Sequence, residues 1–156
     1  MATRSERTLP ERAFPGTGEL APLLPPATAQ TAPFFEALAD GRLALPRWSG
    51  CGRVRTPVGP VCPSCGSESA SWETLSGHGT VHSWIRYRRS YLPQFEPLMP
   101  YVVLCVALDE GARIFGRLVD DASGEDPNAG MPVEAVVERW PGGGAVHAFT
   151  RARERT

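Results

Sequence analysis

The sequence predicts a mainly β protein with a short N-terminal helix, a degenerate zinc ribbon and a C-terminal β-barrel of the OB type. Two glycine-ended turns near Cys51 and Cys62 are typical of a zinc ribbon. Five short runs of strand-forming residues follow between positions 79 and 150, separated by tight turns, which is typical of a small closed barrel. The 156 residues include 16 proline and 16 glycine residues, which favour turns and short strands over long helices.

Composition excludes several classes of function. All 16 basic residues are arginine, so the chain has no lysine to form a Schiff base, to serve as a P-loop lysine or to act as a kinase lysine. The formal net charge of -1 supplies no overall basic field to attract nucleic acid. No stretch is apolar for long enough to cross a membrane.

The N-terminal third is expected to hold an arm and one helix. Residues 1–30 are rich in proline, alanine and threonine without periodicity, and they predict a flexible arm. A helix is expected over residues 31–43, with Thr31 as its N-cap and Pro33 in its first turn. Gly41 lies where a helix usually ends.

Residues 44–74 are predicted to form the zinc-ribbon-like module. Cys62 and Cys65 form a C-x-x-C-G turn, and Cys51 precedes Gly52 in a second turn of the same kind. The position three residues before Cys51 holds Trp48, where a four-thiolate ribbon would have its first cysteine. We therefore predict Cys51, Cys62 and Cys65 as metal ligands.

The sequence alone does not identify the fourth ligand of that metal site. Water, His78, His82 or a group from a partner could complete it. In the alternative interpretation the ribbon is metal-free and held by packing, with Trp48 filling the vacated space, because loss of one thiolate weakens a structural zinc site severely.

Residues 75–150 are predicted to form the OB-type barrel, and residues 151–156 a polar tail. The five expected strands cover residues 79–88, 101–108, 112–119, 133–140 and 145–150. Cys105 lies in the second of these runs, which is almost continuously apolar, so we predict a core thiol rather than a nucleophile.

The densest basic cluster consists of Arg86, Arg88 and Arg89, with Tyr87 and Tyr91 interleaved. Guanidinium groups match phosphate geometry, and aromatic rings stack on bases, so this segment suits the phosphates and adenine of CoA or a single-stranded nucleic acid. A solvated face or an ion-paired partner interface is the other interpretation. The following loop, residues 92–100, is apolar and rich in proline. It is expected to be a partner surface if exposed and a barrel lid if packed.

Six stretches together resemble a known family of acyl-CoA-associated proteins. That family has an N-terminal helix, a rubredoxin-like zinc ribbon and a C-terminal OB-fold, and was long catalogued as a domain of unknown function. The stretches are PFFEALADGRL at 33–43, VCPSCG at 61–66, SGHGTVHS at 76–83, PYVV at 100–103, LDEG at 108–111 and GMPV at 130–133. Trp48 departs from the family pattern, which usually has a cysteine ligand there.

The resemblance implies a non-catalytic accessory subunit of a thiolase-like or aldolase complex that acts on acyl-CoA thioesters. Substrates of such complexes include steroid or lipid side chains and acyl groups of secondary metabolism. The expected partner is a thiolase-fold protein in a two-plus-two assembly, with zinc and acyl-CoA as ligands. The cytoplasm is predicted separately, from the clustered C-x-x-C cysteines and the lack of an export signal at the N-terminus. Arg86, Arg88 and Arg89 are then the expected CoA contacts, and no catalytic residue is expected. The alternatives are a nucleic-acid-binding OB and zinc-ribbon protein and a stand-alone acyl-CoA enzyme.

Overall fold

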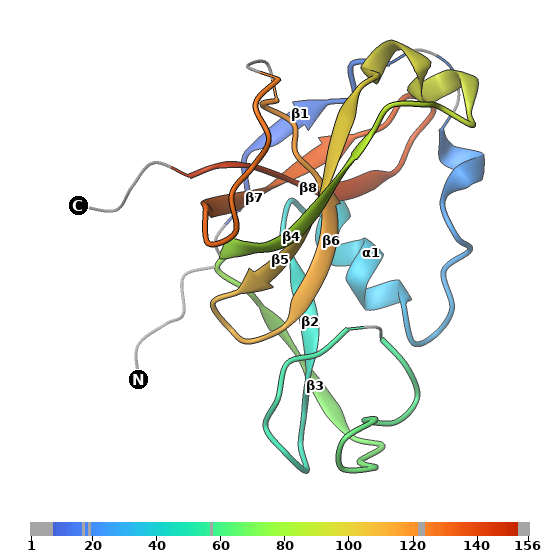
Figure 1. Cartoon of the computed structure of the whole chain (residues 1–156). Coiled ribbons are helices and arrows are strands. Elements are labelled where there is room, and N and C mark those ends of the chain that lie inside the picture. The colour runs from blue at the N-terminus through green and yellow to red at the C-terminus, as the bar shows by residue number, and fades with distance from the viewer. Residues whose placement is uncertain (1–7, 17, 19, 57, 122–123, 153–156) are drawn as a thin grey trace.

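The computed structural model describes residues 8–16, 18, 20–56, 58–121 and 124–152. Two ribbon strands extend away from a barrel that carries one helix on its side (Figure 1). The helix α1 covers Ala32–Ala39, and 3-10 turns cover Ala21–Leu23 and Pro93–Leu98. The strands are β1 Glu11–Ala13, β2 Ala44–Trp48, β3 Ala70–Thr74, β4 His78–Tyr87, β5 Tyr101–Leu108, β6 Arg113–Arg117, β7 Pro132–Arg139 and β8 Ala145–Arg151.

The barrel has the OB strand arrangement. Antiparallel β4, β5 and β6 form a meander, β4 also pairs with β7, and β7 pairs with β8. A parallel bridge between Leu118 and Phe149 closes the circle, with the Val119 N–H donating to the Phe149 carbonyl at 2.8 Å. This confirms the five predicted strands and the predicted mainly β fold, because each apolar run provides one strand of the closed sheet.

One core joins the helix, the ribbon base and the barrel. On β5, Val102, Leu104 and Val106 are fully buried, as expected where every second side chain faces inward. Leu38 of α1 and Leu45 of β2 belong to the same buried cluster. The ribbon therefore stands on the barrel core, and its cysteine turns are held at a fixed end of the fold.

The helix is shorter than predicted. It ends at Ala39 rather than near residue 43, because Asp40 forms its C-cap and Gly41 has a φ of 75°. Thr31 precedes it as the N-cap residue but makes no side-chain capping bond, since its hydroxyl accepts the Thr28 N–H at 2.9 Å.

The prediction of a flexible arm over residues 1–30 is wrong for the described residues from 8 onward; residues 1–7 lie outside the described part. Strand β1 pairs in parallel with β7, and the Val137 N–H donates to the Pro10 carbonyl at 2.9 Å. Leu9, Phe14 and Leu20 are buried. These three side chains are far apart in a proline-rich sequence, so they produce no periodic pattern, yet each fills a site on the barrel.

No helix in the described part of the chain is long and apolar enough to cross a membrane.

Candidate metal centre and ligand surfaces

The two cysteine turns of the ribbon have the same backbone structure. In the second turn the Gly66 N–H donates to the Cys62 carbonyl at 2.9 Å, and in the first the Gly52 N–H donates to the Trp48 carbonyl at 2.7 Å. Gly66 and Gly52 have φ values of 70° and 68°, which only glycine adopts freely. Trp48 therefore occupies the position in the first turn that Cys62 occupies in the second.

The three predicted ligand cysteines converge. The sulfur atoms of Cys51, Cys62 and Cys65 all lie within 4.8 Å of one another, and the Cys51 and Cys62 sulfurs are 3.8 Å apart. Thiolates bound tetrahedrally at about 2.3 Å from one zinc ion would be about 3.8 Å apart. The cluster therefore fits three corners of a zinc tetrahedron.

The cluster also favours a thiolate. Burial raises the pKa of the Cys62 thiol, but hydrogen bonds from the backbone of Ser64 and Cys65 and from the thiols of Cys65 and Cys51 outweigh it and lower the pKa to about 7. The hydrogen bond from the Ser67 backbone lowers the pKa of Cys65, but burial and the neighbouring thiols together outweigh it, so the pKa is raised. A metal ion bound by the three sulfurs would hold them as thiolates.

Neither histidine considered as a fourth ligand joins the cluster. Among the described residues, no His, Asp or Glu ligand atom lies with the three sulfurs. His78 opens β4 and lies against residues of β7 and β8, and His82 also belongs to β4, whereas the sulfurs lie in the ribbon turns. The fourth corner is left to water or to a partner group.

Trp48 is buried, with 3% of its surface exposed, and its indole N–H has no hydrogen-bond partner in the described part of the chain. A buried indole in the first ligand position fills the ribbon turn with apolar volume instead of a sulfur. The degenerate ribbon predicted from the sequence is confirmed.

The structure separates the three arginines predicted to bind CoA. The Arg86 side chain is 6% exposed, and its guanidinium pairs with Asp121 at 2.6 Å and with Asp126 at 2.8 Å. It also donates to the Glu125 carbonyl at 3.2 Å. Arg86 therefore fastens the loop after β6 to β4, while Arg88 and Arg89 are exposed.

Replacing Arg86 with alanine should lower the free energy of unfolding by about 2–3 kcal/mol, because Asp121, 11% exposed, would lose its partner. Arg88→Ala is the matched control and should change it by less than about 0.5 kcal/mol. Urea denaturation followed by circular dichroism measures both. Equal stability of the two variants would show that the buried ion pair contributes nothing.

The proline-rich loop after β4 is partly a lid and partly a surface. Phe95 packs edge-on against Phe14 with ring centroids 5.5 Å apart, and it also contacts Tyr101 and Trp140. These contacts within its own chain leave Phe95 half-buried, so this part of the loop is a lid on the barrel. Tyr91 and Leu92 are exposed at 81% and 41%.

Strand β4, which precedes this loop, also exposes large hydrophobic side chains. Ile85 and Tyr87 are 54% and 36% exposed, and the Arg89 guanidinium lies 5.7 Å from the Tyr91 ring centre. We call Ile85, Tyr87, Tyr91 and Leu92 the β4 patch. Aromatic side chains bordered by arginine are typical of the centres of protein interfaces.

Cys105 is buried at 8% exposure, as expected of a core thiol.

The chain has the architecture of zinc-ribbon and OB-fold proteins, because a cysteine ribbon stands on a barrel of the OB type. One ligand position of the ribbon is substituted. Family models agree in detail: the model described as "ChsH2, rubredoxin-like zinc ribbon domain" matches residues 35–70, and "ChsH2, C-terminal OB-fold domain" matches residues 72–138. A solved chain titled "Ltp2-ChsH2(DUF35) aldolase" is 35% identical with a TM-score of 0.74, covering 83% of this chain and 100% of that one. The chain belongs to the ChsH2 (DUF35) family.

Curated relatives connect that family with two contexts. The chain is 42% identical over 102 residues to a "Probable enoyl-CoA hydratase alpha subunit" of Thermomonospora curvata, covering 64% of this chain and 30% of the relative. It is 39% identical over 94 residues to a "DUF35 domain-containing scaffold protein" of Methanocaldococcus jannaschii, covering 60% and 65%. The chain thus spans less than two thirds of either relative.

Proposed function

We propose that this chain is a non-catalytic accessory subunit of a thiolase-fold enzyme that acts on acyl-CoA thioesters. The observation that carries the proposal is the match to the whole DUF35 chain of the Ltp2-ChsH2 aldolase at 35% identity. The hydratase-subunit and scaffold relatives support the same acyl-CoA and assembly context.

The chemistry of the chain supports a role without catalysis of its own. It has no lysine and only three histidines. The His147 Nε2 lies 2.6 Å from the Phe115 carbonyl, which can only accept, so Nε2 carries the proton. Burial lowers the pKa of His147 and keeps the ring neutral.

The β4 patch is proposed as the surface that docks on the partner, with Arg88 and Arg89 at its edge. A thiolase-fold homodimer offers two equivalent sites, so a two-plus-two assembly is proposed. Zinc bound by Cys51, Cys62 and Cys65 would stiffen the ribbon. All four cysteines are free thiols, which suits a reducing compartment such as the cytoplasm.

The test is turnover of acyl-CoA thioesters by the chain alone, by its thiolase-fold partner alone and by the two together. We expect no turnover by the chain alone, because it has no lysine and the ring of His147 is bonded to the Phe115 carbonyl rather than to a nucleophile. We expect turnover by the mixture to exceed that of the partner alone. Turnover by the isolated chain would favour the stand-alone enzyme.

A further inference from the structure

The two cysteine turns share a backbone structure but differ in the ligands that they offer. In each turn a second hydrogen bond runs from the N–H of the first residue to the carbonyl five positions on, at 2.8 Å from Cys62 and at 3.0 Å from Trp48. A metal ion bound to Cys62 and Cys65 would join the two sides of the second turn. The first turn offers Cys51 alone, so a metal ion cannot join its two sides in the same way.

An arginine side chain holds the first turn. Arg47 of β2 donates from Nη1 to the Gly52 carbonyl at 2.5 Å and from Nε to the Glu73 carboxylate. Gly52 directly follows Cys51, and Glu73 lies on β3, the neighbouring strand of the ribbon. One forked guanidinium therefore ties the cysteine end of the turn to the strand beside it. We call the bonds of Arg47 to Gly52 and Glu73 the Arg47 clamp.

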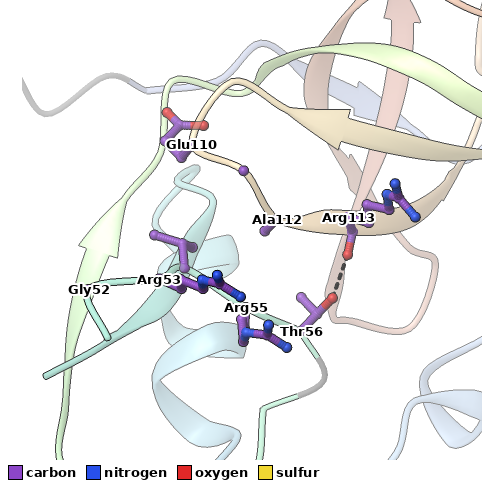
Figure 2. A pocket seen from close by; sticks show the side chains of 9 residues that line it. Gly52, Arg53, Arg55, Thr56, Glu110, Ala112 and Arg113 are labelled. Atoms are coloured by element: carbon purple, nitrogen blue, oxygen red, sulfur yellow. Dashed lines mark hydrogen bonds between the residues drawn. The ribbon is translucent and has the colours of Figure 1, made fainter. Parts of the chain in front are cut away.

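The anchors of the first turn are themselves fixed. The Glu73 side chain is 9% exposed, and a buried carboxylate paired with a guanidinium makes a strong, charge-assisted hydrogen bond. The segment that follows the turn is tied to the barrel, because the Thr56 hydroxyl donates to the Arg113 carbonyl of β6 (Figure 2). The first turn is thus held to the ribbon sheet on one side and to the barrel on the other, and neither contact involves a metal ion.

The first turn also packs directly on the second. A Cβ added to Gly50 would lie 2.9 Å from the Cys65 sulfur and 3.1 Å from the Cβ of Ser67. The φ of Gly50 lies outside the left-handed region, so the limit at this position is space and not backbone conformation. The backbone of the first turn is therefore in contact with one of the sulfurs that Cys51 would join in a metal site.

We propose that Arg47 is a positioning residue that keeps Cys51 beside the other two sulfurs, so that the three-thiolate site is preformed in the absence of a metal ion. A structural zinc site commonly uses the binding energy of the metal to fold its turns. In this chain the Arg47 clamp closes the first turn instead. The metal ion is then removable, and its loss leaves the ribbon folded. The inference goes beyond the proposed accessory role, and the isolated chain tests it.

Sequence reasoning missed Arg47, because the partner that fixes it is distant in sequence. Glu73 lies 26 positions beyond Arg47 and meets it only when β2 pairs with β3. The signal that could have indicated this role is the position of Arg47 directly before Trp48, the substituted ligand position.

The zinc affinity of the full chain, measured by competition with a chromophoric chelator, tests the inference. Arg47→Ala should bind zinc about ten- to a hundredfold more weakly, the usual effect of removing a group that orients a metal ligand. Arg53→Ala is the matched control, because it removes the same charge from an exposed residue near Cys51, and it should bind zinc as the wild type does. Gly50→Ala should also weaken zinc binding. Gly59→Ala should not, because no described atom beyond its chain neighbours lies within 4 Å of the added Cβ.

Amide hydrogen exchange in the metal-free chain distinguishes positioning from a general loss of stability. The Gly52 and Gly66 N–H groups make the same hydrogen bond in the two turns, so each serves as the reference for the other. Both should stay protected when the metal ion is removed from the wild type. In Arg47→Ala the Gly52 N–H should exchange about tenfold faster, whereas the Gly66 N–H should keep its rate.

Four results would overturn the inference. They are equal zinc affinity of Arg47→Ala and Arg53→Ala, equal loss of protection at Gly52 and Gly66 in Arg47→Ala, loss of Gly52 protection when the wild type gives up its metal ion, and failure of the wild type to bind zinc. All four are measured without a partner protein. Failure of assembly would contradict the proposed function instead, so the two failures are distinguishable.

Discussion

Replacing Trp48 with cysteine is expected to raise the affinity of the ribbon for zinc by roughly a hundredfold or more. A four-ligand structural site contributes about 10–16 kcal/mol of apparent binding free energy, and one thiolate of four accounts for about 3 kcal/mol of it. The new sulfur would occupy the backbone position equivalent to Cys62, since both turns close with the same hydrogen bond. Elemental analysis after mild chelation measures the zinc retained per chain.

Trp48→Ala is the matched control, because it removes the buried ring without adding a ligand. It should lower stability by cavity formation and leave zinc retention at or below that of the wild type. If the wild type already keeps one zinc ion per chain as firmly as Trp48→Cys, a fourth ligand completes the site without position 48.

A charge placed in the β4 patch is expected to abolish assembly with the partner. Ile85→Asp and Tyr91→Asp each introduce a carboxylate into a surface that must lose water on docking, and central interface positions typically contribute about 2–4 kcal/mol. Both side chains are exposed, so the isolated chain should fold normally. Size-exclusion chromatography of each variant with the partner measures the loss.

Val61→Asp is the control for the β4 patch. Val61 is also an exposed apolar residue, at 43%, but it lies in the ribbon before Cys62. It should leave assembly intact. If Val61→Asp dissociates the complex and Ile85→Asp does not, the ribbon rather than β4 docks on the partner. Phe95→Asp is unsuitable for this test, because Phe95 packs against Phe14 and Trp140 and the variant would disturb the barrel.

The sequence predicts the local features of this fold well. The C-x-x-C-G turn and the alternating runs of the barrel are short-range patterns, and they determine where the ribbon and the five strands lie. The convergence of Cys51 with Cys62 and Cys65 follows from the same turns. The position of Trp48 could be predicted because the equivalent cysteine is only three residues from Cys51.

Long-range features could not be predicted in the same way. Strand β1 forms only because β7 offers an edge to it. The ion pair between Arg86 and Asp121 joins residues 35 positions apart, so it cannot be read from the sequence. Arg86 was therefore predicted as a ligand contact, although in the fold its charge is neutralised by Asp121. The hydrogen bond from the Thr56 hydroxyl to the Arg113 carbonyl likewise forms only because the chain brings the ribbon and the barrel together.

The most direct test of the central claim is the mass of the species formed when this chain is co-expressed with a thiolase-fold protein of the same genome. Light scattering coupled to size-exclusion chromatography should show one mixed species with the mass of two copies of each chain. Separate elution of the two proteins, each at its own mass for every thiolase-fold candidate, would contradict the assignment of this chain as an accessory subunit.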